Sequence, residues 1–181
     1  YSGPQGQRSG AAYVFNAETG QQLRKLLPDD GAPYAYFGFG VGLSGDRAVI
    51  GAWGDTQNGA DSGAIYSFSL LLNQQLAKIV PADGEENDRF GHCVAVQGAT
   101  AIAGAYRDDL AGYESGSAYV YTLGEGCRAD VDGDGSVTTQ DFLAFLNAWV
   151  GHLPAGDWDG NGVWDTQDFL GFLNAWSQGC A

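Results

Sequence analysis

The chain has 181 residues, of which 44% are hydrophobic and 29 are glycine, a composition that suits strands and turns better than long helices. Its 22 acidic and 8 basic residues give a net charge of −14, so nucleic acid and anionic membranes are not expected partners. No apolar run is long enough to predict a membrane span, and the lack of methionine predicts a processed chain or a fragment.

Residues 1–126 contain an ungapped repeat with a period of 53 residues. Ser9-Gly-Ala-Ala-Tyr-Val-Phe15 recurs as Ser62-Gly-Ala-Ile-Tyr-Ser-Phe68 and again as Ser115-Gly-Ser-Ala-Tyr-Val-Tyr121. Within one period, alternating apolar residues bounded by turn residues predict four strands. These are expected at 37–43, 47–52, 63–68 and 75–80. Four antiparallel strands in a repeat of this length are typical of a propeller blade.

This repeat resembles the FG-GAP repeats that form the blades of integrin-type β-propellers. The resemblance rests on Phe37-Gly38 followed by Gly51-Ala52-Trp53, and on Phe90-Gly91 followed by Gly104-Ala105-Tyr106. An aromatic residue replaces the proline of the family motif in both copies. The resemblance implies a mainly β, propeller-like domain over 1–126. The repeats amount to roughly two and a quarter blades, fewer than a closed propeller needs, so other chains or further residues are expected to complete the sheets.

Some FG-GAP blades hold Ca²⁺ in the loop after this motif, and the matching residues here are Asp55, Asn58 and Asp61. Their spacing lacks the alternate-residue ligand order of the family's calcium loop. A weak metal site and a solvated polar turn therefore both stay open for this loop. Cys93 lies in an apolar strand pattern and is interpreted as a small buried residue.

Residues 127–181 hold two copies of one pattern, offset by 27 residues, in which an Asp- and Gly-rich loop runs into an apolar helix. Ca²⁺ takes oxygen ligands, and an EF-hand loop supplies them from positions 1, 3, 5, 7, 9 and 12. All eight acidic residues of this segment fall on such positions, which a generic acidic surface would not produce. The predicted ligands are Asp130, Asp132, Asp134, Ser136, Thr138 and Asp141 in the first loop, and Asp157, Asp159, Asn161, Val163, Asp165 and Asp168 in the second.

This segment resembles a dockerin domain, a small all-α module with two calcium loop–helix units, here of the cysteine-flanked bacterial type. The resemblance implies two bound Ca²⁺ ions and a cohesin-like partner. In the family, loop positions 10 and 11 help to select that partner. These positions are Thr139, Gln140, Thr166 and Gln167 in this sequence.

Cys127 and Cys180 bracket the calcium segment, and a disulfide between them would tie its two ends together. Such a bridge implies an oxidising compartment, and the chain is expected to be secreted or displayed at a cell surface.

The sequence predicts a secreted, non-catalytic adhesion, binding or structural protein that a calcium-dependent module anchors to a cohesin or to another subunit. One alternative is an extracellular filament subunit, in which copies of the chain complete one another's blades. Another is the C-terminal part of a polysaccharide-degrading enzyme, because dockerins are often fused to such enzymes. No pair of carboxylates, metal triad or nucleophile–base pattern in these residues predicts catalysis.

Overall fold

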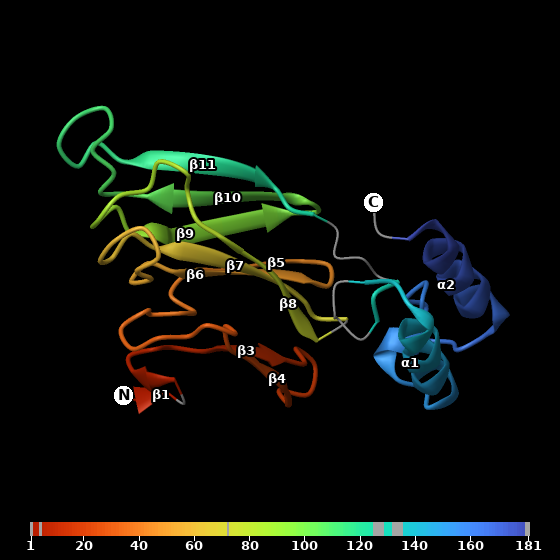
Figure 1. Ribbon diagram of the computed structural model, residues 1–181. Coiled ribbons are helices and arrows are strands. Elements are labelled where there is room, and N and C mark those ends of the chain that lie inside the picture. Colours follow the sequence, from red (N-terminus) through yellow and green to blue (C-terminus); the bar gives the residue numbers. More distant parts are fainter. Residues whose placement is uncertain (1, 4, 72, 125–128, 132–135, 180–181) are drawn as a thin grey trace. The chain divides into compact units, whose positions relative to one another are not determined.

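The computed structural model describes residues 2–3, 5–71, 73–124, 129–131 and 136–179. It divides into two compact units, one made of Tyr1–Phe68 and Gln75–Leu123 and the other of Ser69–Gln74 and Gly124–Ala181. The first unit is built from antiparallel strands, and the second contains both α-helices (Figure 1). No described helix is both long enough and apolar enough to cross a membrane.

The first unit contains a short hairpin and three sheets that follow one another in chain order. The hairpin pairs β1 (Ser2–Gly3) with β2 (Gly6–Gln7), and the first sheet pairs β3 (Ala12–Phe15) with β4 (Gln22–Leu26). The second sheet has the order β5 (Val41–Ser44), β6 (Arg47–Ala52), β7 (Ala64–Ser69) and β8 (Gln74–Ile79). The third has the order β11 (Ser117–Thr122), β10 (Thr100–Ala105) and β9 (Phe90–Gln97).

These sheets match the 53-residue repeat strand by strand. The four-stranded sheet is one complete repeat, β3 and β4 correspond to its last two strands, and β9 to β11 correspond to its first three. Three of the four predicted strands agree with β6, β7 and β8 to within one residue. The remaining prediction, 37–43, differs from the structure: β5 begins at Val41, the first residue that pairs with β6, and Gly38 before it has a φ of +90°.

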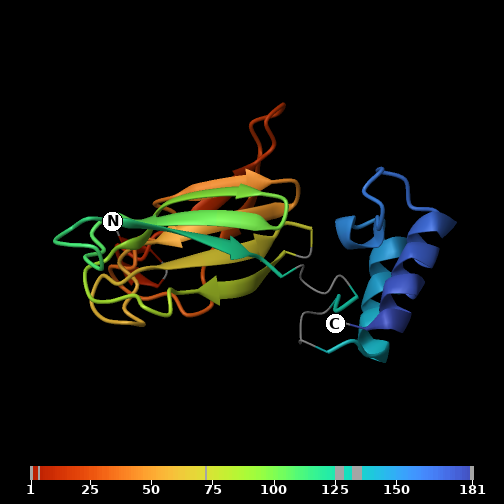
Figure 2. The ribbon, with the colours of Figure 1, turned by 90° about the horizontal axis from the view of Figure 1, so that it is seen from above.

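The third sheet packs on the second through a continuous apolar core. Figure 2 shows the strands of the two sheets overlapping in the view from above. Val49 and Ile65 on the second sheet meet Phe90, Ala101 and Ala103 on the third, and all are buried. Apolar burial on one face of each strand is the main source of stability for such a stack.

Each Phe-Gly motif joins one sheet to the next. Phe37 forms an isolated parallel bridge with Gly10, and Phe90 forms the equivalent bridge with Gly63. A side chain at Gly63 would place its Cβ 2.0 Å from the carbonyl oxygen of Phe90. Glycine is therefore required there for the close approach of the two backbones.

The second unit contains α1 (Thr139–Val150), the short 3₁₀ helix η1 (Pro154–Gly156) and α2 (Thr166–Gln178). Each α-helix begins with a capping box, formed by Thr138 with Asp141 and by Asp165 with Asp168. The apolar faces predicted from the 3.6-residue periodicity meet at Phe145 and Phe172, which are fully buried.

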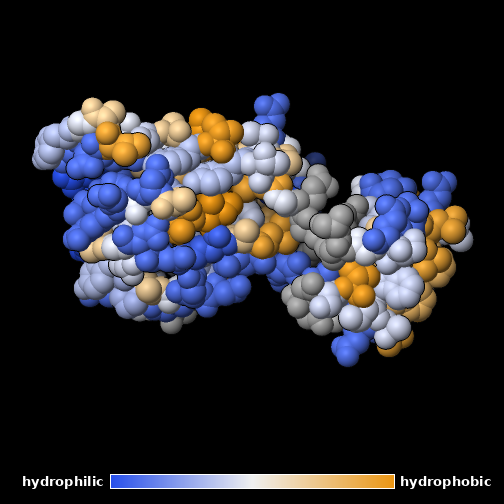
Figure 3. All heavy atoms as spheres, turned by 45° about the horizontal axis from the view of Figure 1, so that its top comes forward, coloured by the Kyte–Doolittle hydropathy of each residue, from blue (hydrophilic) through white to orange (hydrophobic). Residues whose placement is uncertain are grey.

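Cys93 is exposed on β9, so its interpretation as a buried residue was wrong. Along β9 exposed and partly buried residues alternate, and Cys93 lies on the face that points away from the second sheet. That face also carries Ile102 and Val120, which are 44% and 68% exposed. Figure 3 shows hydrophobic side chains gathered in several patches over the sheets.

Candidate functional site

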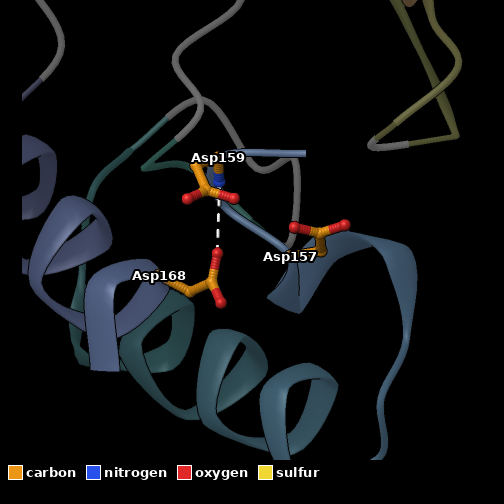
Figure 4. Close-up of side chains that lie close together, drawn as sticks. All are labelled: Asp157, Asp159 and Asp168. Carbon is orange, nitrogen blue, oxygen red and sulfur yellow. Dashed lines mark hydrogen bonds between the residues drawn. The ribbon is translucent and has the colours of Figure 1, made fainter. Parts of the chain in front are cut away.

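Three carboxylates of the second Asp-rich loop converge at the N-terminus of α2. One oxygen atom from each of Asp157, Asp159 and Asp168 lies within 4.8 Å of the others. Figure 4 shows Asp168 on the first turn of α2, with its carboxylate pointing towards the loop that carries the other two side chains. The loop is thus folded so that residues eleven positions apart in sequence share one small volume.

Asp168 is held in place by backbone N–H groups. Its Oδ1 accepts hydrogen bonds from the N–H groups of Trp158 at 2.6 Å and Asp159 at 3.2 Å, and its Oδ2 accepts one from Asp165 at 2.8 Å. Complete burial opposes ionisation, but these donors outweigh that effect and hold the pKa of Asp168 below its ordinary value. The side chain is therefore a carboxylate at neutral pH.

The remaining oxygens of the cluster suit a hard cation. Oδ2 of Asp157 accepts a hydrogen bond from the N–H of Gly162, while its Oδ1 is buried without a hydrogen-bond partner. Asp159 accepts the backbone N–H of Asn161, and Asn161 accepts that of Val163, so short local turns orient both side chains. A buried carboxylate oxygen without a donor is costly unless a cation meets it. The donor set consists of oxygens, which Ca²⁺ prefers.

The other predicted ligands of the second loop lie differently. Asp165 uses its side chain to cap α2, accepting from the N–H of Gln167 at 2.7 Å. Its carbonyl oxygen accepts the indole N–H of Trp149 at 3.0 Å. Asn161 and Val163 are exposed. The structure therefore brings three of the six predicted ligands of this loop into one cluster.

Where the first loop is described, its contacts match those of the second loop. Asp141 is fully buried and accepts the N–H of Thr138 at 2.7 Å, as Asp168 accepts that of Asp165. Thr138 caps α1, and its carbonyl oxygen accepts the indole N–H of Trp176 at 2.8 Å. Asp130 is buried and Ser136 is exposed, while Asp132 and Asp134 lie outside the described residues.

The predicted partner-selecting residues lie on the first turns of the two helices. Thr139, Gln140, Thr166 and Gln167 are all exposed. One turn further along each helix are Leu143 and Leu170, which are 58% and 63% exposed. The helical unit therefore presents two equivalent polar and apolar surfaces. Cys127 and Cys180, the cysteines of the predicted disulfide, lie outside the described residues.

The predicted metal ligands of the blade loop, Asp55, Asn58 and Asp61, form ion pairs or hydrogen bonds with other residues of the protein. Oδ2 of Asp55 lies 2.8 Å from the ammonium of Lys78, and Asp61 lies 4.0 Å from the guanidinium of Arg89. The side-chain amide of Asn58 donates to the carbonyl of Pro81 at 2.8 Å. Of the two alternatives that the sequence left open for this loop, a weak metal site and a polar turn, this arrangement favours the polar turn.

A second polar cluster was not anticipated from the sequence. The hydroxyl of Tyr66 lies 3.0 Å from Asp30 and 2.9 Å from Asp55, and Lys78 forms ion pairs with both carboxylates. Burial opposes the charge on Lys78, but hydrogen bonds to Asp30 and Asp55 and their negative charges raise its pKa. The recurrence of Tyr and Asp at intervals of 53 residues was the available sequence signal.

A row of rings and guanidinium groups links the motifs of successive repeats. Tyr36 stacks on Trp53 with 4.3 Å between ring centroids, and the guanidinium of Arg89 lies 4.7 Å from the Trp53 ring centroid. Arg89 also lies over Tyr106. The aromatic residue that replaces the family's proline therefore supplies packing between repeats.

Comparison with known proteins assigns the β unit. The FG-GAP repeat family matches residues 21–68 and 74–121, which together make up more than half of the chain. No curated protein matches the sequence. The matched segments contain the strands of the second and third sheets except for Ser69 at the end of β7 and Thr122 at the end of β11. The chain belongs to the FG-GAP repeat family.

Proposed function

We propose that this chain is an extracellular, non-catalytic binding protein, whose β unit serves adhesion and whose helical unit binds Ca²⁺ and anchors the chain to a cohesin-like module. FG-GAP repeats are protein-interaction modules that are generally non-catalytic and typically occur in extracellular or surface proteins. The finer parts of the proposal rest on the helical unit.

The observation that carries the calcium proposal is the convergence of Asp157, Asp159 and Asp168, together with the buried Oδ1 of Asp157, which has no hydrogen-bond partner. Three carboxylates in this volume repel one another, and a divalent cation removes that repulsion. The helical unit contains no lysine or arginine apart from Arg128, so its described part offers no cationic side chain of its own. In a bound state, Asp157, Asp159 and Asp168 would be the ligands of one ion, with Asp130 and Asp141 contributing to the other.

The anchoring proposal is supported by the two equivalent exposed surfaces. Thr139, Gln140 and Leu143 on α1 match Thr166, Gln167 and Leu170 on α2 at an offset of 27 residues. A partner that recognises one of these surfaces is able to recognise the other after a half-turn of the helical unit. Exposed leucines beside polar hydrogen-bonding groups suit a protein interface.

Isothermal titration calorimetry of the full chain with Ca²⁺ tests the metal proposal. Two sites are expected for the native chain, and Asp157→Asn is expected to weaken one of them at least tenfold. Asp46→Asn, in the turn between β5 and β6, is the matched control and should leave both sites intact. No heat of binding at millimolar Ca²⁺ would contradict the proposal. A cohesin-like module that binds the native chain equally well with Ca²⁺ and with a chelator would contradict calcium-dependent anchoring.

A further inference from the structure

Two tryptophan side chains join the end of each helix of the second unit to the start of the other. Trp149, near the end of α1, donates its indole N–H to the carbonyl of Asp165 at 3.0 Å. Trp176, near the end of α2, donates its indole N–H to the carbonyl of Thr138 at 2.8 Å. Asp165 and Thr138 are the N-cap residues of α2 and α1. Each helix therefore ends beside the residue at which the other begins.

Ring packing accompanies each of these hydrogen bonds. The ring centroids of Trp149 and Phe169, on the first turn of α2, are 5.9 Å apart, and those of Trp176 and Phe142, on the first turn of α1, are also 5.9 Å apart. The two contacts are related by the 27-residue offset of the repeat. Each indole is thus held by aromatic contact as well as by a hydrogen bond, and the hydrogen bond is the contact that reaches a loop residue.

The carbonyl that Trp149 contacts belongs to the second predicted calcium loop. Asp165 is the ninth residue of that loop, and its backbone N–H donates to Asp168 Oδ2 at 2.8 Å. The other carboxylate oxygen of Asp168 accepts two backbone N–H groups from the beginning of the loop, so one side chain ties the two ends of the loop together. Trp149 therefore fixes the residue that holds one carboxylate of the three-aspartate cluster.

The first loop has the same connection in its described part. Thr138 is its ninth residue and donates its backbone N–H to Asp141 Oδ2 at 2.7 Å. Asp141 is fully buried, and the carbonyl of Thr138 is the one that Trp176 contacts. A tryptophan of α2 thus holds the loop that precedes α1, and a tryptophan of α1 holds the loop that precedes α2.

We propose that Trp149 and Trp176 are positioning residues for calcium binding, and that each acts on the loop of the opposite helix. This inference rests on the proposed function of the helical unit. A loop that is already fixed in its binding conformation loses less conformational freedom on binding, so it binds more tightly. Each indole N–H supplies part of that constraint from outside the loop that it holds.

Calorimetry of the full chain in two single-site backgrounds tests the proposal. Asp157→Asn weakens the second site and leaves the first to be measured, and Asp130→Asn does the converse. In the Asp157→Asn chain, Trp176→Phe should weaken Ca²⁺ binding about three- to tenfold, the effect of losing one neutral hydrogen bond, whereas Trp149→Phe should leave it unchanged. In the Asp130→Asn chain the two substitutions should exchange their effects.

The crossed pattern separates positioning from a general loss of stability. Phenylalanine keeps an aromatic ring at each position and removes the indole N–H, and a general loss of packing would weaken both sites alike. Trp53→Phe, in the β unit, is the matched control and should change neither site, because the indole N–H of Trp53 has no hydrogen-bond partner in the part of the chain that the structure describes. Equal effects of Trp149→Phe and Trp176→Phe in either background would overturn the proposal.

The indole N–H resonances give a second readout, in chains that keep both tryptophans. Filling the first site of an isotope-labelled Asp157→Asn chain should shift the indole resonance of Trp176 more than that of Trp149, and the Asp130→Asn chain should show the reverse. Equal shifts of the two resonances would contradict the crossed assignment. A native chain that binds no Ca²⁺ would refute the proposed function together with this inference, whereas two bound ions without the crossed pattern would overturn this inference alone.

Discussion

The rings of Phe145 and Phe172 lie parallel, with 4.1 Å between their centroids and 4° between their planes. The two residues occupy equivalent positions, 27 residues apart, in α1 and α2. Both are fully buried, and Trp158 packs edge-on against each of them. This pair therefore forms the centre of the small core that holds the two helices together.

Truncation of one ring should unfold much of the helical unit. We expect Phe172→Ala to destabilise it by about 3–5 kcal/mol, because the substitution leaves a cavity where a large ring was buried. Leu170→Ala on the same helix is the control and should cost far less, since Leu170 is 63% exposed. Denaturation followed by tryptophan fluorescence is a suitable measurement, because four of the five tryptophans lie between Trp149 and Trp176. Equal losses would show that the pair is not central to the core.

The contact between Gly63 and Phe90 can be tested with a matched pair of glycine substitutions. Gly63 has a φ of +88°, and an added Cβ would lie 2.0 Å from the backbone oxygen of Phe90. Gly45 also has a positive φ, of +60°, but an added Cβ there would meet nothing within 4 Å. Gly45→Ala should therefore cost only the conformational strain, about 1 kcal/mol. Gly63→Ala should cost about 3 kcal/mol or more, because two sheets must also separate. Urea denaturation compares the two, and similar losses would refute the close approach.

The strands were predictable because the same strand motif occurs three times in the sequence, at intervals of 53 residues. The predicted strand at 47–52 coincides with β6, since alternation and flanking turn residues act locally. Cys93 was misplaced because alternation identifies two faces without saying whether another sheet covers each one. In the complete sheet the equivalent position is Gly40, which lies against the third sheet.

Of the two polar clusters, the one formed by local contacts was predictable from the sequence, and the one formed by contacts between distant segments was not. The spacing of Asp157, Asp159 and Asp168 predicted a common cluster, because a loop closed by a helix N-terminus is a local structure. The cluster around Lys78 joins residues from two loops and two strands, and only the stacking of β7 and β8 on those loops brings them together. The spacing of these residues along the chain does not specify which loops the strands pack against.

The ion pairs of Lys78 should give the β unit a defined pH dependence. Burial opposes the charge on Asp30, but hydrogen bonds from Lys78 and Tyr66 hold its pKa below the ordinary value. A lowered pKa means that this contribution to stability is present above the unfolded pKa, about 4, and is lost as the pH falls through the folded pKa. The raised pKa of Lys78 has the opposite sign, so its contribution is lost only above about pH 10.

The substitution Lys78→Met should therefore lower the free energy of unfolding by a constant amount between about pH 5 and 9. We expect about 2–3 kcal/mol, because the change leaves the buried carboxylate of Asp55 unpaired while Lys78 itself keeps some contact with water. Urea titrations of the native and variant chains from pH 2.5 upward should show the difference shrinking at acid pH. Asp30→Asn should remove the part of that shrinkage that Asp30 causes, and a difference that grows on acidification would contradict the assignment.

Removal of Ca²⁺ should affect the two units separately. A cation bound by the three carboxylates stabilises the helical unit by mass action, by about 2.7 kcal/mol for one site at a hundredfold excess over its dissociation constant. We therefore expect a chelator to lower the unfolding temperature seen by tryptophan fluorescence. Asp157→Asn should reduce that shift, because it removes a ligand at the site with the unpartnered oxygen. In the β unit the predicted blade-loop ligands Asp55 and Asp61 are paired with Lys78 and Arg89, so its unfolding, followed by circular dichroism at strand wavelengths, should not change. A chelator that destabilised the strands and spared the helices would place the dominant metal site in the blade loops instead.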